Sequence, residues 1–165
     1  MKATGIVRRI DDLGRIVIPK EIRRTLRIRE GDPLEIYTEK DGEVIFKKYS
    51  PMGDLQAVAA QLCESIGKNT GHIAAVSDRD AVIAAYGVQR RELMDKHCSQ
   101  ELEQLMEARK IYRYQPGQAK IYPSDASERY YLGVSAPILS EGDLMGCVML
   151  LMNDNDIAPT EAEQK

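Results

Sequence analysis

Residues 14–26 have the sequence Gly14-Arg15-Ile16-Val17-Ile18-Pro19-Lys20-Glu21-Ile22-Arg23-Arg24-Thr25-Leu26, and they set the expected structure around them. The β-branched run at residues 15–18 predicts a strand. Pro19 suits the first position of a helix, because its missing N–H is not needed there. We expect that helix to end near Arg27, with its arginines turned away from the apolar face.

Further short strands are expected on both sides of this run. Residues 5–10 predict a strand, and residues 11–14 have the composition of a turn. Residues 34–38 and 43–48 flank Lys40-Asp41-Gly42. An Asp-Gly pair between strand-like runs is a strong hairpin signal. The first 50 residues are therefore expected to form short β-hairpins around one short helix.

The expected domain boundary is Ser50-Pro51-Met52-Gly53, where Pro and Gly interrupt regular structure. This gives a first domain at residues 1–50, a linker at 51–53 and a second domain at 54–165. A domain of about 50 residues buries too little surface to be stable alone. We therefore expect residues 1–50 to fold as part of an obligate dimer.

The second domain is expected to be α+β with an antiparallel sheet. An amphipathic helix is predicted from the spacing of Leu55, Val58, Ala59, Leu62, Cys63 and Ile66. Residues 73–86 and 130–152 each predict a hairpin, and residues 88–110 predict one or two helices. The run 144–152 is apolar on both alternating faces, which is typical of a central strand covered on both sides.

Charge divides unequally along the chain. Residues 1–50 carry 12 basic and 9 acidic groups, whereas residues 51–165 carry 11 and 17. This pattern indicates a basic module joined to an acidic one, with a polyanion as the candidate partner of the basic module. A guanidinium group can donate two hydrogen bonds at once to a phosphate group or to the edge of a guanine base. The alternative is a solvated basic surface paired with Asp11, Asp12 and Glu21. The candidate DNA-binding residues are Arg8, Arg9, Arg15, Arg23 and Arg24.

The segment 2–26, with its continuation through residues 31–37 and 47–49, resembles the AbrB family of bacterial transition-state regulators. That resemblance implies a swapped-hairpin β-barrel built from two interleaved chains. It also implies binding of double-stranded DNA through Arg8, Arg15, Arg23 and Arg24. Position 9 is often Lys in relatives, so Arg9 keeps the charge. Joined to an acidic α+β domain, the segment is similar to two-domain regulators of sporulation genes.

The second domain is similar to GAF-like sensor domains, through its first helix and the hairpins at residues 77–80 and 133–146. Relatives continue beyond the position of Gln164 into a long helix, so we expect a truncated terminal helix. Two roles stay open: sensing of a small ligand, and a structural clamp that joins two DNA-binding dimers into a tetramer. No ligand-binding residue, cofactor or metal ligand is assigned.

Other functional classes have weaker support. Cys63 and Cys147 lie on apolar stripes and are expected in the core, and His72 and His97 lack metal-ligand spacing with the cysteines. We expect no enzyme, no membrane segment and a cytoplasmic, nucleoid-associated protein. Two alternatives remain. A MazE-type antitoxin shares the barrel but ends in an extended tail, and a free methionine sulfoxide reductase needs two cysteines at an open pocket.

Overall fold

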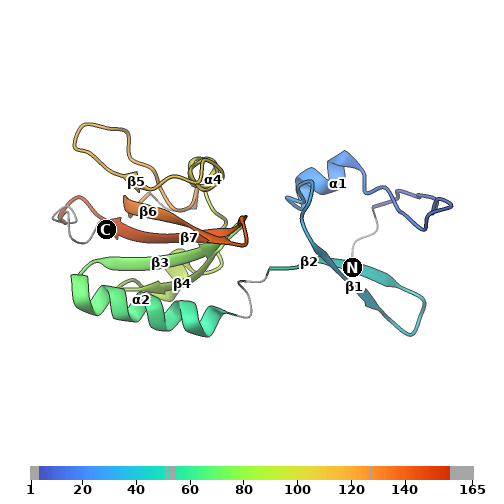
Figure 1. The fold of residues 1–165 in the computed structure, drawn as a ribbon, viewed down its shortest axis with the longest axis horizontal. Coiled ribbons are helices and arrows are strands. Elements are labelled where there is room, and N and C mark those ends of the chain that lie inside the picture. Colours follow the sequence, from blue (N-terminus) through green and yellow to red (C-terminus); the bar gives the residue numbers. More distant parts are fainter. Residues whose placement is uncertain (1–3, 51, 53–54, 127, 157–165) are drawn as a thin grey trace. The chain divides into compact units, whose positions relative to one another are not determined.

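The computed structural model describes residues 4–50, 52, 55–126 and 128–156. The chain separates into two compact units that divide between Tyr49 and Ser50 (Figure 1). The division falls where proline and glycine interrupt regular structure.

The first unit holds one helix and one hairpin. Strands β1 (Leu34–Thr38) and β2 (Val44–Lys48) pair antiparallel, with Ile36 opposite Phe46. Gly42 closes their turn at φ 81°, a conformation that glycine adopts without steric cost. The hairpin predicted around Lys40-Asp41-Gly42 is confirmed.

Helix α1 (Lys20–Thr25) begins one residue later than predicted, with Pro19 as its N-cap. Its end is a Schellman motif. The Ile28 N–H donates to the Arg23 carbonyl at 2.7 Å, and the Arg27 N–H donates to the Arg24 carbonyl at 3.2 Å. Arg27 has φ 52°, so it occupies the left-handed position that glycine usually takes in this motif.

The strands predicted at residues 5–10 and 15–18 are wrong for the single chain, in which neither run is a strand. The turn between them is present. The Asp11 N–H donates to the Arg15 carbonyl at 3.1 Å, and Gly14 has φ 77°. A strand needs a continuous ladder of backbone hydrogen bonds. In the described part of one chain, the backbone–backbone bonds of these two runs are those that close the turn.

The second unit is built on a five-stranded antiparallel sheet with the order β4-β3-β7-β6-β5. Its strands are β3 (Ile73–Asp78), β4 (Val82–Tyr86), β5 (Tyr112–Arg113), β6 (Tyr131–Ser140) and β7 (Asp143–Met152). Strand β7 lies between β3 and β6, at the middle of the sheet. The predicted central strand and both predicted hairpins are confirmed.

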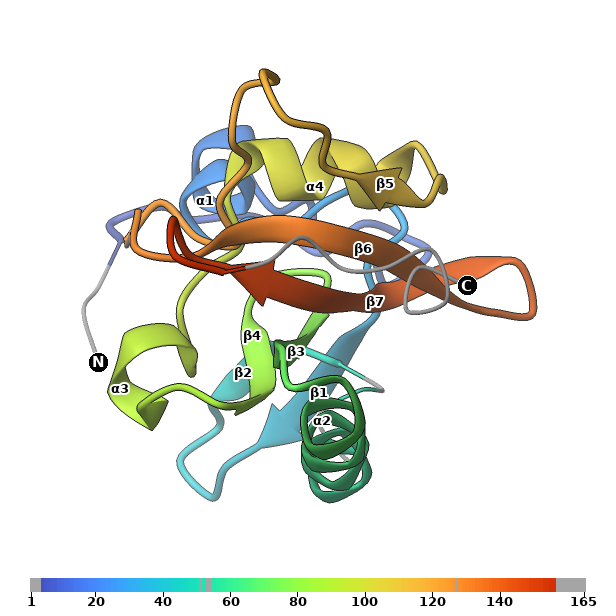
Figure 2. The same ribbon diagram turned by 90° about the vertical axis from the view of Figure 1, so that its left-hand side faces the viewer.

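Helices cover both faces of this sheet. Helix α2 (Gln56–Thr70) packs on one face, and α4 (Gln100–Glu107), preceded by the short α3 (Arg90–Leu93), packs on the other (Figure 2). The apolar core therefore has two layers. The α4 layer includes Leu102, Met106, Leu132, Met149 and Leu151, and the α2 layer includes Ala59, Cys63, Ala74, Val76 and Leu150.

The stripe predicted along α2 is only half buried. Ala59 and Cys63 face the sheet, whereas Leu55, Val58 and Leu62 are 46%, 59% and 46% exposed. Among the described residues, no helix combines the length and apolar character needed to span a membrane.

Candidate nucleic-acid interface

Helix α1 carries two of the candidate arginines. The dihedrals of Pro19 start the helix and the Schellman motif ends it, so the backbone of this six-residue element is fixed at both ends. Arg24 is exposed and Arg23 is partly exposed. Both arginines lie on a short helix that has no buried residue.

The loop before α1 carries the other three. Arg8, Arg9 and Arg15 are exposed. The Nε of Arg15 donates to a carboxylate oxygen of Asp11 at 2.8 Å, and the Arg15 side chain is still 70% exposed. The backbone N–H and then the side chain of Arg15 lower the pKa of the Asp11 carboxyl. Within the described residues, no ion pair joins Asp12 or Glu21 to these five arginines. The alternative of a basic surface neutralised by paired acids therefore applies to Arg15, one of the five candidate arginines.

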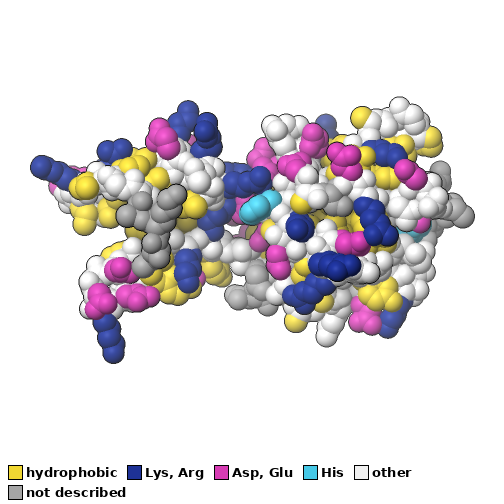
Figure 3. Space-filling model, turned by 180° about the vertical axis from the view of Figure 1, so that it is seen from behind, with side chains coloured by type: hydrophobic (Ala, Val, Ile, Leu, Met, Phe, Trp, Pro, Cys, Tyr) yellow, Lys and Arg dark blue, Asp and Glu magenta, His cyan; other side chains and the backbone are white. Residues whose placement is uncertain are grey.

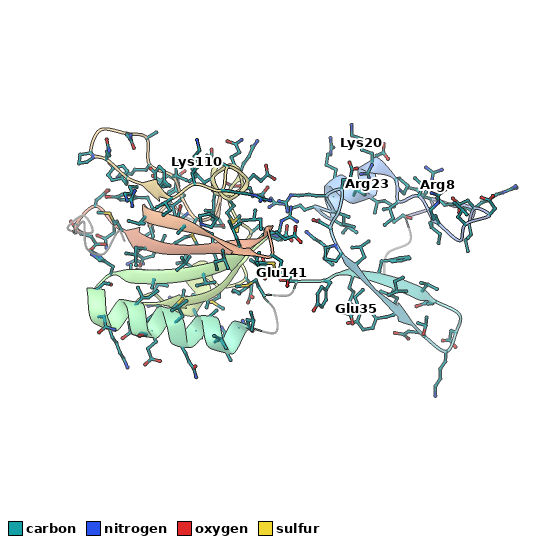
Figure 4. All side chains as sticks on the ribbon, viewed as in Figure 1. Arg8, Lys20, Arg23, Glu35, Lys110 and Glu141 are labelled. Atoms are coloured by element: carbon teal, nitrogen blue, oxygen red, sulfur yellow. The ribbon has the colours of Figure 1, made fainter. Side chains whose placement is uncertain are left out.

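Basic side chains predominate on the α1 side of this unit, where Asp11, Asp12 and Glu21 are the acids among them, whereas the hairpin carries both signs of charge. Arg8, Lys20 and Arg23 lie on the α1 side, whereas Glu35 lies on the β1–β2 hairpin (Figure 4). Lys and Arg side chains gather along the α1 side in the space-filling view (Figure 3). A surface with an excess of positive charge attracts a polyanion and releases its counterions.

A second group of contacts, which the sequence did not reveal, ties α1 to the hairpin. The Lys48 Nζ on β2 donates to the Arg27 carbonyl at 2.8 Å. A carboxylate oxygen of Asp32 accepts from the Arg29 N–H at 2.8 Å and lies 3.7 Å from Lys48 Nζ. Asp32 lies in the segment between α1 and the hairpin. Its side chain is 5% exposed, so this tie is shielded from water.

The same unit exposes much of its apolar surface. Among residues 4–49, only Pro19 is buried. Val7 is 86% exposed and Val17 is 71% exposed, and hydrophobic side chains are prominent on this unit in Figure 3. The full set of exposed large apolar residues is Ile6, Val7, Ile10, Leu13, Ile16, Val17, Leu26, Ile36, Tyr37, Val44, Phe46 and Tyr49. So large an exposed apolar surface is typical of an interaction surface.

The cysteines of the second unit are inaccessible. Cys63, Cys98 and Cys147 are 0%, 0% and 2% exposed. Burial raises the pKa of Cys98 and of Cys147 to about 12 and that of Cys63 to about 11. The core prediction for Cys63 and Cys147 is confirmed. A reductase needs a thiolate at an open pocket, and these thiols are neutral and enclosed.

A cavity of about 450 Å³ lies between α2 and the sheet. Its walls are mainly apolar, from Ile66, Val134, Val148 and Leu150, and Asn69 adds a polar group. The size and the lining fit a small, mostly apolar molecule.

Comparison with known proteins gives matches to both units. Residues 54–165 match the family described as "Stage V sporulation protein T C-terminal, transcription factor". Residues 7–54 match the family described as "Antidote-toxin recognition MazE, bacterial antitoxin".

Two relatives come from Bacillus subtilis (strain 168). Stage V sporulation protein T is 44% identical over 161 residues, which cover 98% of this chain and 90% of that protein. Transition state regulatory protein AbrB is 63% identical over 51 residues, which cover 31% of this chain and 52% of that protein.

Two solved structures also align with the first unit. The N-domain of the transcription factor AbrB is 61% identical, covers 31% of this chain and 96% of that one, and gives a TM-score of 0.29. The N-terminal DNA recognition domain of B. subtilis AbrB is 63% identical, covers 31% and 94%, and gives a TM-score of 0.28.

Proposed function

This chain belongs to the stage V sporulation protein T family of transcription factors, and from that premise we propose that it regulates bacterial sporulation genes by binding duplex DNA. The proposed contact residues are Arg8, Arg9, Arg15, Arg23 and Arg24. Their exposure on α1 and on the loop before it carries the proposal. Phosphate contacts supply most of the affinity, and a subset of arginines reaches guanine edges. The action is binding rather than catalysis, in the cytoplasm where the nucleoid lies.

The DNA-binding form is a dimer in which residues 1–50 of two chains interleave as a swapped-hairpin barrel. The exposed apolar residues of this unit support it, because a second chain buries them. Residues 5–10 and 15–18, which have no ladder in one chain, then pair with strands of the partner. A dimer also presents each arginine twice.

Thermal unfolding of the full chain at several protein concentrations tests this dimer. The midpoint of an obligate dimer rises with concentration by mass action. A midpoint for the first unit that stays constant over a hundredfold dilution would count against the barrel.

The second unit is proposed as a GAF-like domain that joins two such dimers into a tetramer. Leu55, Val58 and Leu62 on the outer side of α2 support this role, because their spacing of three and four residues suits packing against a second helix. The occupant of this face is the same helix of another copy.

Ligand sensing is the second candidate role of this unit, favoured by the cavity between α2 and the sheet. Ala136→Leu would fill part of that cavity. The fluorescent probe 1-anilinonaphthalene-8-sulfonate should bind the native protein and lose most of its affinity for the variant. Equal binding to both proteins would remove the support for a ligand site here.

A further inference from the structure

Asp11 divides its two carboxylate oxygens between the backbone of the loop and one arginine. One oxygen accepts from the Leu13 N–H at 3.0 Å and from the Arg15 N–H at 2.8 Å. The other accepts from the Arg15 Nε at 2.8 Å. The backbone N–H of Asp11 also donates to the Arg15 carbonyl at 3.1 Å. The backbone and the side chain of Arg15 are therefore both held by one residue.

The way Arg15 is held decides which of its donors are available. A guanidinium has five N–H donors, one on Nε and four on the two Nη atoms. The Asp11 contact uses Nε, so the Nη donors lie at the free end of a side chain that is 70% exposed. Two Nη groups in a fixed plane match two adjacent acceptors, such as the O6 and N7 atoms of guanine or two phosphate oxygens.

We propose that Asp11 is a positioning residue for DNA recognition, which anchors Arg15 through Nε so that its Nη pair faces the duplex. This inference rests on the proposed function. It also assigns a favourable role to an acid in a surface that binds a polyanion. Repulsion between a carboxylate and phosphates weakens binding, whereas positioning of Arg15 strengthens discrimination between sequences. The two effects are therefore separable by experiment.

Asp11→Asn and Asp12→Asn form a matched pair. Both remove one negative charge from the same exposed turn. The asparagine oxygen at position 11 retains an acceptor for the N–H groups of Leu13 and Arg15, but its amide nitrogen is a donor and cannot accept from Nε. D11N thus keeps the turn and releases the guanidinium. Asp12 makes no ion pair with an arginine of the set within the described residues.

The test measures the affinity of the full chain for two duplexes. One is enriched from a random pool by the wild-type protein, and the other is a scrambled duplex of equal length. D12N should tighten binding to both by the same factor. D11N should lose about tenfold in discrimination between them, because the released guanidinium no longer holds the geometry of a bidentate base contact. Equal tightening on both duplexes by D11N and D12N would overturn the inference.

A double substitution distinguishes positioning from a general effect on the loop. In an Arg15→Ala background, D11N should change discrimination no more than D12N does, because the guanidinium that Asp11 holds is absent. The same loss with and without Arg15 would overturn the role of Asp11. If R15A binds both duplexes like the wild type while Arg24→Ala weakens both, the positioning inference fails and the DNA interface stands. If neither arginine matters, the proposed function itself fails.

Discussion

The ammonium group of Lys48, at the end of β2, donates a 2.8 Å hydrogen bond to the backbone carbonyl of Arg27, just past the end of α1. Arg27 is the left-handed residue of the Schellman motif that ends α1, so the bond fixes the segment that terminates the helix. The bond joins two elements that are 21 residues apart along the chain. It holds the arginine-bearing helix against the hairpin.

Lys48→Met should therefore weaken the first unit. A hydrogen bond to a charged group contributes about 1.5–3 kcal/mol. Because the Lys48 side chain is 26% exposed, we expect a loss of about 1–2 kcal/mol in the free energy of unfolding, measured with urea. Lys40→Met removes the same charge from the exposed turn of the hairpin and is the control. Equal stability of the two variants would show that the tie has no energetic role.

Gly146→Ala should destabilise the second unit. A Cβ at this position in β7 would lie 2.0 Å from the Ser77 backbone carbonyl oxygen of β3, and neighbouring strands cannot separate without losing ladder bonds. We expect a loss of about 2–3 kcal/mol in the free energy of unfolding, as for other overpacked sites.

Gly67→Ala is the informative comparison. Its Cβ would lie 2.2 Å from an atom of the Tyr86 ring, a side chain that can rotate. Alanine also gains about 1 kcal/mol in helix propensity over glycine. G67A should therefore cost much less than G146A, and the reverse order would contradict this reading of the two contacts.

The three thiols should resist modification at pH 8 until the second unit unfolds, as measured with a chromogenic disulfide reagent. Burial raises the pKa of Cys98 to about 12, whereas an unfolded thiol ionises near about 8.5. Above that pH the unfolded state loses protons that the folded state retains, so stability should decline as pH rises from about 8.5 towards the folded value. Cys98→Ala should flatten this decline between about pH 8.5 and 9.5. Rapid reaction of the native thiols would contradict this expectation and would support a redox function for the second unit.

The exposed stripe on α2 should control assembly of the second unit. Leu62→Asp places a charge in the proposed helix–helix contact and should convert tetramers into dimers in sedimentation velocity measurements. Gln61→Glu changes charge by the same amount at a neighbouring exposed position and should leave assembly unchanged. Tetramers that persist in L62D would exclude this face as the contact.

Local patterns were sufficient for much of the fold. The Asp41-Gly42 pair specified the β1–β2 turn, and the uninterrupted apolar run of β7 specified the central strand. The runs at residues 5–10 and 15–18 have strand composition but no ladder in one chain, because composition does not say where the hydrogen-bonding partner lies. On α2, the stripe pattern could not separate Ala59 and Cys63, which touch the sheet, from Val58, which does not.

For a similar reason, the sequence predicts the residues of the candidate site but not the contacts that hold them. The sequence identified the five arginines through their charge and their family resemblance. It did not reveal how Asp11 holds Arg15, or how Lys48 reaches Arg27, because such contacts depend on backbone dihedrals and on pairing across the hairpin. From the sequence, Asp11 is a turn residue and an acid that could neutralise the basic surface.

The central claim is that two copies of residues 1–50 place their arginines on one surface that contacts DNA. The salt dependence of DNA affinity tests it most directly, because the log–log slope changes by about 0.9 for each phosphate contact. Arg24→Ala removes two guanidinium groups from a dimer, so the slope should become shallower by about 1.8. A slope that is unchanged in R24A, or an affinity of the wild-type chain that does not vary with salt, would contradict the account.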